Sequence, residues 1–522
     1  MRLLPSLFLL ALLFICPLVQ AFNFEDKTDK KYVILKLDDV VDGPDNQIIS
    51  ERWLRVTHFL EEKKLKAAFG IIGYSLVEDN LHYFQWIKDT HNKGLVEFWN
   101  HGFLQRKASD KEGEFEKDFA TQYRSLFLTD SLAKAKLGLT LNTWGPHWSN
   151  TNEYTDSALA AIPSLQLTFG YPASTKHFKG IILPRIIDLE YPVHNPDFAS
   201  FVKEYNKLSE RRFLSYLQGH PNSWNNTRWS EFVKIIEFLM QEGYEFITPS
   251  EYLTMLKHEK SVSFYNRLLN MEGLAAFWNF KEKSGDKYYA VTDRNLGLID
   301  VNNSIHTVEE GPLWDSSISF DGKSYLMIPN QDMGKLNITG SVTVLAWIKW
   351  EGNTNSFIAG PWNEYQDGGK RQYGLFVSLP HYNGRDQVCG HISKTGKPTP
   401  PFPYSIDYSA SKQIVPTKEW CCVGFTYDGE YIKSYLNGAF EAREPELIDH
   451  TKGFEGYPDG LIQSKNPYYF PDGIGDNGSD FTVGAVLLKS GMGNFFKGQI
   501  GGIAVFSRAL SEEEMKEVSI TN

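Results

Sequence analysis

The sequence predicts two domains of different class, an α/β domain built as a (β/α) barrel and then an all-β domain built as an antiparallel β-sandwich. Three observations predict this. The chain has 522 residues, which is too long for one ordinary core, and 42% of them are hydrophobic, which is too many for a disordered chain. Short apolar segments alternate with amphipathic segments from Lys31 to about Leu256. After about Gly273, β-type alternation continues without intervening helical patterns.

The chain begins with a segment typical of protein export. An apolar run from Leu3 to Val19 ends in Val19-Gln20-Ala21, with small residues at the two positions that a signal peptidase reads. We expect residues 1–21 to be a cleaved signal peptide and the mature chain to be secreted, either outside the cell or into a periplasm. Pro5 and Pro17 interrupt the run, which is also short for a membrane anchor, and no later segment is apolar enough to span a bilayer.

The first domain is predicted to contain eight strands separated by helices, which fits a (β/α) barrel of about 225 residues. The expected strands are Tyr32–Leu37, Ala67–Ile72, Leu95–Trp99, Leu137–Leu141, Leu165–Phe169, Ile181–Leu183, Phe213–Gln218 and Glu245–Thr248. Apolar residues recur every three or four positions in the clearest helices, Glu51–Lys64, Leu81–Asn92, Trp229–Gln241 and Ser250–Lys257. In such a barrel the chemistry lies on the loops that follow the strands.

The polar stretch His258–Ser261 marks a change of pattern, and we place the domain boundary between residues 260 and 261. Beyond it, Val342–Trp350 alternates between two faces, and turn signals such as Asp428-Gly429 and Asn437-Gly438 separate further β-rich runs. The predicted organisation is a leader at 1–21, a barrel at 22–260 and a sandwich at 261–522.

The composition and net charge limit the classes of binding partner that we expect. The formal net charge of −11 disfavours binding to a polyanion, so nucleic acid is not expected as a partner. Neutral glycans stay among the possible partners, since 13 Trp and 26 Tyr are suited to stacking on sugar rings as well as to packing in β-structure. After removal of the leader, Cys389, Cys421 and Cys422 form an odd set without the spacing of a zinc site, and we expect buried thiols. The oligomeric state is not indicated.

Polar residues follow three strands of the predicted barrel. Asp38 and Asp39 end the first strand, His101 follows the third, and His220 follows the seventh. Each alone is more often a turn, a cap or a structural residue. Together they converge on one rim, where one carboxylate can hold a cation while another accepts a proton from water.

These segments resemble the polysaccharide deacetylases, the NodB-like carbohydrate esterases. The resemblance covers most of residues 30–255 and implies a deformed (β/α) barrel that holds a divalent metal, commonly zinc, and acts on a polysaccharide or oligosaccharide. The segments that carry it are Leu37-Asp38-Asp39, Glu97-Phe98-Trp99-Asn100-His101-Gly102-Phe103, Trp144-Gly145-Pro146 and Gly219-His220-Pro221-Asn222-Ser223-Trp224.

By this resemblance Asp38 is the catalytic base, and His220 is the acid that protonates the leaving group. Asp39 and His101 are metal ligands. The implied reaction is attack of water on an acetyl carbonyl, with the cation stabilising the oxyanion that develops. The residues expected to contact the substrate are Asn100, Trp144 and Trp224. The alternative role for these side chains is packing. Whether the acetyl group is carried on nitrogen or oxygen is left open.

One departure from the family pattern concerns the second metal-binding histidine, which is expected a few residues after His101. Gln105 stands at that position, and an amide is a poorer zinc ligand. His147 and Glu114 are candidate substitutes, although packing roles are favoured for both. Zinc lowers the pKa of bound water from 15.7 to about 7, which is worth about 12 kcal/mol in hydroxide availability. An empty site therefore predicts an alternative, a catalytically silent glycan-binding protein, and Gln105→His is expected to restore zinc binding.

The second half resembles laminin-G-like, concanavalin-A-like jelly rolls. The resemblance is carried by Gly273–Phe280, Ile318–Gly322, Thr343–Lys349, Phe425–Gly429 with Tyr435–Gly438, and Ile503–Ser511. It implies the fold and leaves the ligand open, since such domains bind glycans, bind proteins or act as spacers.

Two local features of the second half are candidates for ligand contacts. Trp362 and the run Tyr468–Phe470 are candidates for stacking on sugar rings, with the pinning of loops as the alternative. Asp476 and Asp480 are candidates for a Ca²⁺ site, since this cation prefers oxygen ligands.

Overall fold

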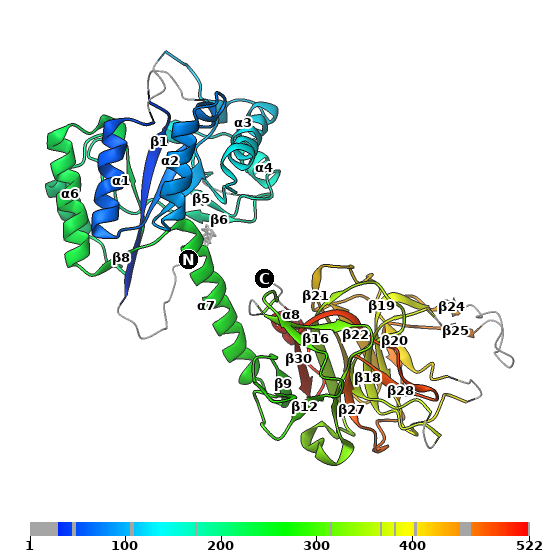
Figure 1. Cartoon of the computed structure of the whole chain (residues 1–522). Helices are drawn as coiled ribbons and strands as arrows, with labels where there is room; N and C mark the ends of the chain where they lie inside the picture. The colour runs from blue at the N-terminus through cyan, green and yellow to red at the C-terminus, as the bar shows by residue number, and fades with distance from the viewer. Residues whose placement is uncertain are drawn as a thin grey trace, which may run out of the picture. The chain divides into compact units, whose positions relative to one another are not determined.

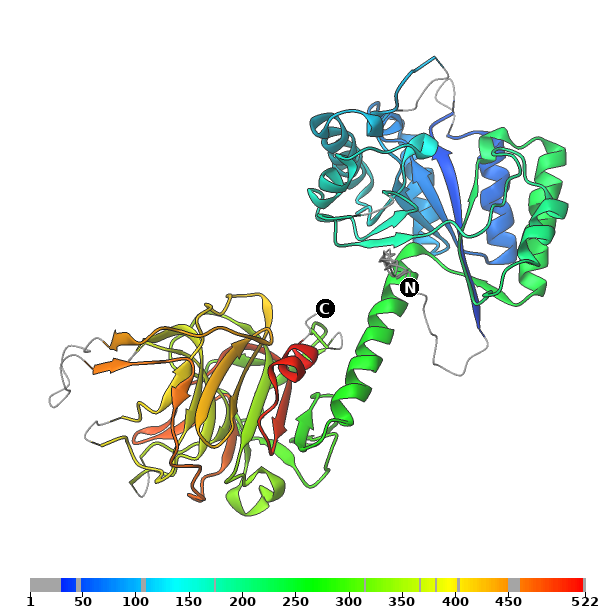
Figure 2. The ribbon, with the colours of Figure 1, turned by 180° about the vertical axis from the view of Figure 1, so that it is seen from behind.

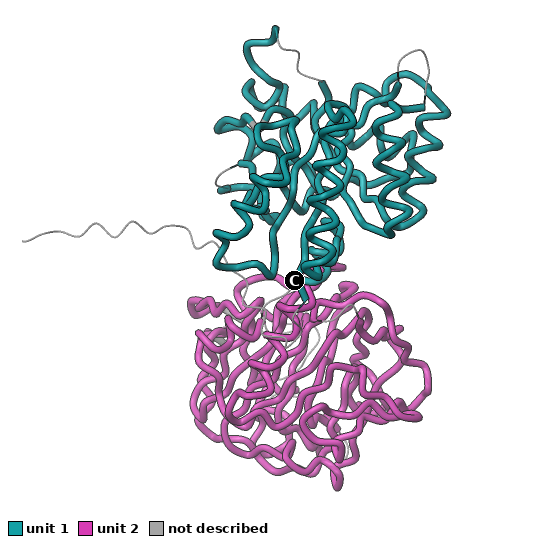
Figure 3. Tube along the Cα trace, turned by 90° about the vertical axis from the view of Figure 1, so that its left-hand side faces the viewer, with its two compact units in different colours: residues 1–255 teal, residues 256–522 magenta. Residues whose placement is uncertain are grey.

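The computed structural model divides into two compact units, unit 1 at residues 1–255 and unit 2 at residues 256–522 (Figures 1, 2 and 3). The leader predicted at residues 1–21 and Gln105 lie outside the described residues. Within the described residues, no helix combines the length and the apolar character of a membrane span. The structure describes residues 30–43, 48–104, 109–172, 175–313, 316–365, 368–380, 383–400, 404–448 and 461–519.

Unit 1 alternates strands and helices. Its elements are β1 (Lys31–Val40), α1 (Glu51–Lys63), β2 (Ala67–Ile71), α2 (Leu81–Asn92), β3 (Val96–Asn100), α3 (Phe119–Leu132), β4 (Thr143–Trp144), α4 (Thr155–Ala160), β5 (Leu167–Phe169), β6 (Ile181–Leu183), α5 (Phe198–Tyr205), β7 (Phe213–Gly219), α6 (Asn226–Gln241), β8 (Tyr244–Phe246) and α7 (Pro249–Leu269). Helices α1, α2 and α6 pack with the strands in one apolar cluster.

The strands of unit 1 form a parallel half-barrel. Their order is β6-β5-β4-β3-β2-β1-β7, with β8 paired to the beginning of β1. The ends of this path, β6 and β7, approach each other through one antiparallel bridge between Arg185 and Ser215. The predicted deformed barrel is confirmed as a fold class, and the deformation is this incomplete closure. All loops that follow the parallel strands emerge at one edge.

Two predicted elements of unit 1 differ from the structure. The strand expected at Leu137–Leu141 is absent; Ala133–Leu137 continues helix α3 as a π-helical turn, and Gly138 ends it at φ 75°. The fourth strand is β4, six residues later. Helix α7 continues through the polar stretch taken as a boundary and crosses from unit 1 into unit 2, because residues such as Glu259 and Lys260 favour helices.

Unit 2 is an antiparallel sandwich of two nine-stranded sheets. The first runs β10-β11-β12-β15-β27-β17-β18-β19-β20, and the second runs β13-β14-β30-β16-β21-β22-β23 with β9 and β26 attached. The strands of the first sheet are β10 (Lys283–Ser284), β11 (Lys287–Tyr289), β12 (Gly297–Asp300), β15 (Leu326–Ile328), β17 (Ser356–Pro361), β18 (Tyr373–Leu379), β19 (Gly384–Ile392), β20 (Tyr408–Ala410) and β27 (Phe481–Val483).

The second sheet supplies the other half of the core. Its strands are β9 (Leu274–Trp278), β13 (His306–Val308), β14 (Ser317–Asp321), β16 (Val342–Trp350), β21 (Trp420–Tyr427), β22 (Tyr431–Leu436), β23 (Ala439–Phe440), β26 (Tyr468–Tyr469) and β30 (Lys497–Phe506). Two short hairpins, β24 (Glu446–Ile448) with β25 (Leu461–Gln463) and β28 (Val486–Leu488) with β29 (Gly491–Gly493), and helix α8 (Glu512–Val518) complete the unit.

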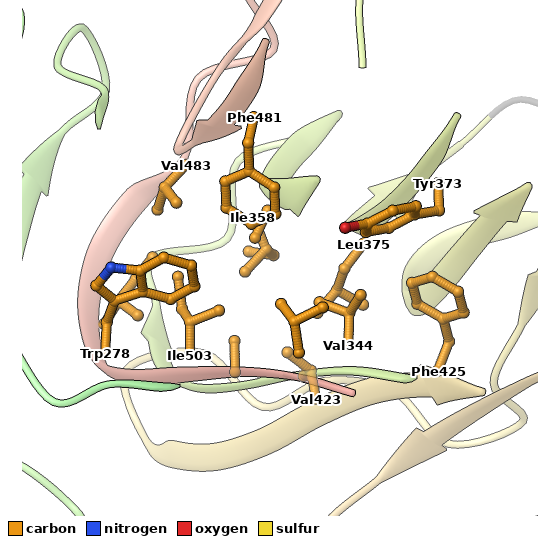
Figure 4. Close-up of a cluster of buried hydrophobic side chains, with 14 of the residues drawn as sticks. Trp278, Val344, Ile358, Tyr373, Leu375, Val423, Phe425, Phe481, Val483 and Ile503 are labelled. Atoms are coloured by element: carbon orange, nitrogen blue, oxygen red, sulfur yellow. The ribbon is translucent and has the colours of Figure 1, made fainter. Parts of the chain in front are cut away.

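The core of unit 2 lies between the two sheets. Figure 4 shows Val344 and Ile503 of one sheet directed toward Ile358 and Leu375 of the other, as alternation along each strand requires. The three cysteines of the unit are free and buried, as predicted. Cys421 faces this core and its neighbour Cys422 faces the opposite side of β21.

Candidate metal and catalytic site

The two adjacent aspartates of β1 are held in a β-bulge. The pairing of β1 with β2 is regular up to Leu37 and shifts its register before Val40, so Asp38 and Asp39 lie within the irregularity. Asp39 has φ 70°, in the left-handed region. In a regular strand neighbouring side chains point to opposite faces, whereas a bulge re-aims them. Both carboxylates can therefore reach the cluster of histidines at the carboxyl edge of the sheet.

Three ligand-type side chains converge at that edge from three strands. Asp39 Oδ1 lies 3.3 Å from His101 Nε2 and 3.1 Å from His147 Nδ1. The two imidazole nitrogens are 3.5 Å apart. His101 follows β3, and His147 begins a short 3₁₀ turn after β4. The three atoms form one of the groups in the described residues that could hold a metal ion.

The surroundings of these atoms fit a divalent cation. His101 Nδ1 donates to the Gly145 carbonyl at 2.9 Å; since a carbonyl only accepts, His101 Nε2 is free to present its lone pair to the cluster. Asp39 Oδ1 is buried without a well-formed hydrogen bond, although two nitrogens face it. Burial acts to raise the pKa of Asp39, but the two imidazoles hold that pKa well below its usual value, so the carboxylate is ionised. Two histidines and a carboxylate are a donor set of catalytic zinc sites.

His147, which the sequence offered only as a substitute, is therefore the candidate for the third ligand position. The other substitute, Glu114, is engaged elsewhere, since its carboxylate accepts hydrogen bonds from the backbone nitrogens of Phe103 at 2.9 Å and Leu104 at 3.1 Å. Glu114 thus fixes the loop that follows His101. Gln105 itself lies outside the described residues, so its effect on metal binding stays a prediction.

Asp38 lies beside this cluster and is paired with a buried lysine. Lys36 Nζ lies 2.7 and 2.6 Å from the two carboxylate oxygens, and both residues are at most 3% exposed. The ammonium also lies 4.9 Å from the centre of the Trp99 ring. Burial lowers the pKa of Lys36, while Asp38 acts to raise it. The pairing keeps a negative charge at the rim without leaving it uncompensated.

His220 completes the rim from β7. Its Nε2 lies 3.7 Å from Asp38 Oδ2, and its Nδ1 lies 2.7 Å from Glu190 Oε2. Glu190 Oε1 also accepts from Trp224 Nε1 at 2.8 Å. Burial acts to lower the pKa of His220, but Glu190 and Asp38 outweigh it and the pKa is raised. Glu190 holds His220 in one orientation. Nothing in the sequence indicated this role beyond the presence of a carboxylate in the loop after β6.

The structure brings Asp38, Asp39, His101 and His220 together, but it does not bring the three expected substrate contacts to the surface. Asn100, Trp144 and Trp224 expose none of their area. Asn100 Nδ2 donates to the Leu126 carbonyl at 3.1 Å, and Trp144 packs against Phe115 with ring centres 4.8 Å apart. Their burial fits the alternative role, in which the three side chains pack in the interior of unit 1 and do not contact substrate.

The search of protein-family models finds a match in the second half of the chain. Residues 320–516 match the concanavalin A-like lectin/glucanases superfamily. The concanavalin A-like fold predicted for unit 2 is thereby confirmed. No curated protein sequence matches the chain.

Three solved structures illustrate the similarity in fold. A family 4 acetyl xylan esterase from Clostridium thermocellum, in complex with a cobalt ion, is 20% identical, with 44% of this chain and 92% of that chain covered and a TM-score of 0.31. A CE4 family pseudoenzyme from Bacillus anthracis is 16% identical, covering 42% and 65%, with a TM-score of 0.30. Domain 4 of an extracellular arabinanase from Geobacillus stearothermophilus, in complex with arabinotriose, is 15% identical, covering 47% and 98%, with a TM-score of 0.32.

The concanavalin A-like unit shows where its candidate ligand residues lie. Tyr468 is buried and donates to Asp407 at 2.9 Å, whereas Tyr469 is exposed and packs beside Tyr431. Trp362 is buried and lines a recess on the outer face of the first sheet. The Asp480 carboxylate accepts from the Asn330 backbone at 2.8 Å. A Ca²⁺ site involving Asp476 and Asp480 stays a prediction.

Proposed function

We propose that the chain is a secreted, metal-dependent carbohydrate esterase that releases acetate from an acetylated polysaccharide. The observation that carries the proposal is the convergence at one rim of Asp39, His101 and His147 with Asp38 and His220. The ligand set, a carboxylate base and a histidine acid are the three parts that metal-assisted acyl hydrolysis needs. The motif resemblance of unit 1 to polysaccharide deacetylases supports the same reaction.

Asp39, His101 and His147 would hold the cation. When bound, such a cation polarises the acetyl carbonyl and makes water more acidic. Asp38 accepts the proton of the attacking water, and its pairing with Lys36 holds the carboxylate in place. His220 donates a proton to the sugar oxygen or nitrogen as its bond to the acetyl carbon breaks. Glu190 keeps His220 Nδ1 protonated, so that Nε2 is the nitrogen that faces the rim.

The test is a metal and activity measurement on the full chain. Wild type should retain a stoichiometric divalent metal after dialysis and release acetate from acetylated xylan or chitin oligomers. His147→Ala should lose both, because two ligands hold a zinc ion poorly. His58→Ala, an exposed histidine of α1, is the matched control and should keep both. Metal content that is negligible in wild type would remove the esterase mechanism and favour the catalytically silent glycan-binding alternative.

Secretion is part of the same proposal. A polysaccharide substrate lies outside the cell membrane or in an extracellular matrix, which agrees with the export signal read at residues 1–21. The protein recovered from culture medium should begin near Phe22 when its N-terminus is sequenced. Recovery only of the uncleaved chain inside the cell would contradict this part of the proposal.

A further inference from the structure

Unit 2 contains a recess that is separate from its core. It has a cavity volume of about 280 Å³ and lies on the face of strands β17, β18 and β19 that points away from the second sheet. Alternation along the strands makes this face: Leu375 and Val377 enter the core, whereas Phe376 between them faces the recess. The recess therefore has a wall of its own, built by a second cluster of buried aromatic residues.

Aromatic rings form one part of that wall. Trp362, Phe376 and Tyr408 surround the imidazole of His391, with ring centres 4.9, 5.2 and 4.7 Å away. All four side chains are at most 4% exposed. Tightly packed rings that line a recess offer apolar surface, and the C–H faces of a sugar ring pack on such surface.

Polar groups are built into the same wall. Arg371 is 1% exposed, and its Nη1 donates to the Gly396 carbonyl at 3.1 Å. Its Nη2 is buried without a hydrogen bond and lies 4.0 Å from Glu364 Oε2. His391 Nδ1 and Ser405 Oγ are also buried without a hydrogen bond. Buried polar atoms are nearly always satisfied, so several unsatisfied ones around one cavity indicate that a ligand completes their hydrogen bonds.

The charges of the recess indicate a neutral ligand. Arg371 is a donor without an acceptor function, and Glu364 brings the opposite charge within 4.0 Å. A phosphate or carboxylate would meet the glutamate, and an ammonium would meet the arginine. Adjacent hydroxyl groups suit both partners, because each hydroxyl donates as well as accepts. An apolar ligand would leave all of these groups unsatisfied.

The recess opens into a wider groove of about 560 Å³, with which it shares Tyr365, Tyr404 and Leu488. Ligand sites usually have volumes of about 300–1,000 Å³, so the recess alone is small. One sugar residue suits the recess, and the next residues of a chain suit the groove. This geometry favours binding at a chain end over binding along a flat platform.

We propose that this recess binds the terminal residue of a neutral glycan, with Arg371 and Glu364 on its hydroxyls and Trp362 on its apolar face. The inference extends the proposed function, since it names the part of unit 2 that holds the polysaccharide. It does not depend on acetate chemistry. A chain without esterase activity would still bind glycan ends through this recess.

The experiment measures binding of neutral oligosaccharides to the full chain by isothermal titration calorimetry. The probes are xylotetraose, cellotetraose, chitotetraose, mannotetraose and maltohexaose, with α-cyclodextrin as the form of maltohexaose without ends. At least one linear probe should bind with a Kd below about 1 mM. Arg371→Met should weaken that binding at least tenfold, and Glu364→Gln, which preserves shape, should also weaken it.

The matched control is Arg443→Met, which removes a half-buried arginine paired with Glu446 outside the recess and should change binding less than threefold. Acetate release from peracetylated xylobiose by wild type is measured alongside as a separate readout of the proposed function. The inference is overturned if no probe binds, if Arg371→Met and Glu364→Gln both bind as wild type does, or if α-cyclodextrin binds as tightly as maltohexaose. If wild type binds an oligosaccharide probe but releases no acetate, the proposed function is overturned and the inference about the recess stands.

Discussion

The two units bury charged side chains in different ways. In unit 1 each buried charge of the rim has a close partner: Lys36 lies 2.6 Å from Asp38, and His220 lies 2.7 Å from Glu190. In unit 2 Lys465 is completely buried, and its ammonium donates to the carbonyls of Ile406 and Tyr408 instead of to a carboxylate. Burial lowers the pKa of Lys465 to about 7.

The difference teaches how a fold keeps a charge or gives it up. A buried ion with a close partner recovers part of the free energy that it loses with its hydration, so its charged form is favoured more than it would be alone. A buried ion without such a partner shifts toward its neutral form. The Lys36–Asp38 and His220–Glu190 pairs are cases of the first kind, whereas Lys465 is a case of the second. The following changes separate these two cases.

The largest effect is expected for the base of unit 1. Asp38→Asn should lower acetate release about 10²–10⁴-fold, the usual contribution of a general base, while metal content stays as in wild type. Asp79→Asn, in an exposed ion pair with Lys136, is the control and should leave the rate unchanged. Steady-state kinetics on acetylated xylan checks both. Unaltered kcat in Asp38→Asn would show that another group accepts the proton.

Next is the lysine that partners the base. Lys36→Met should destabilise unit 1 by about 3–5 kcal/mol, because Asp38 is left as a buried charge without compensation. Lys36→Met combined with Asp38→Leu should recover most of that loss. Hydrogen exchange of the β1 amides measures the local free energy of opening. Lys31→Met, on the same strand but in a surface pair with Glu242, should cost less than about 1 kcal/mol. Equal losses in the two lysine variants would mean that the buried pair adds nothing.

For unit 2 the informative change is Lys465→Met. The unfolded lysine titrates near 10.5 and the folded one at about 7, so between these values the unfolded chain binds more protons and wild type gains stability as the pH rises. Below pH 7 the lysine is protonated in both the folded and the unfolded chain, so wild type has none of this gain in stability. Wild type should therefore gain a few kcal/mol relative to Lys465→Met between pH 7 and pH 10. The charged or titratable groups that face the ammonium are Cys389, Asp407, Arg443 and Glu446, together with the rings of Tyr408 and Tyr468.

Hydrogen exchange of the β19 and β20 amides at both pH values measures this difference. The control is Lys412→Met, which changes a largely exposed lysine and should show no such trend. A constant difference between wild type and Lys465→Met from pH 7 to pH 10 would mean that the buried lysine keeps its ordinary pKa.

The smallest effect is expected for Gln105→His. Because the proposed site already takes its third ligand from His147, an added imidazole should change zinc affinity by no more than about a few-fold. Zinc titration of wild type and of the variant, each followed by calorimetry, measures it. A large gain in affinity would show that His147 is not a ligand and that the position expected from the family pattern is vacant.

Most residues of the rim could be predicted from the sequence, because their prediction required only the positions at which the strands end. His101 and His220 each follow a strand whose end was placed within one residue, and Asp38 follows the predicted first strand, which in the structure continues three residues further to Val40. Parallel strands present their carboxyl ends at one edge. His147 was undervalued because the fourth strand was placed at Leu137–Leu141. With β4 at its position in the structure, the same rule selects His147.

Other contacts had no local signal in the sequence. Glu190 lies in a long loop after β6, 30 residues before the histidine that it orients. Lys36 was read as part of a buried apolar strand, since nothing in the sequence shows which face of β1 meets Trp99. The recess of unit 2 depends on which face of β18 and β19 is left outside the sandwich, which only the pairing of the sheets decides.

The left-handed backbone of Asp39 has a consequence for how this chain changes over generations. An L-residue in that region gives up about 1–2 kcal/mol, although aspartate tolerates it better than most, and glycine avoids this steric cost. A lineage that stopped using the metal would relieve this backbone strain by exchanging the aspartate for glycine. Random mutation would then erase this ligand early. Persistence of the aspartate among descendants of this sequence would therefore record continued selection for the bound cation.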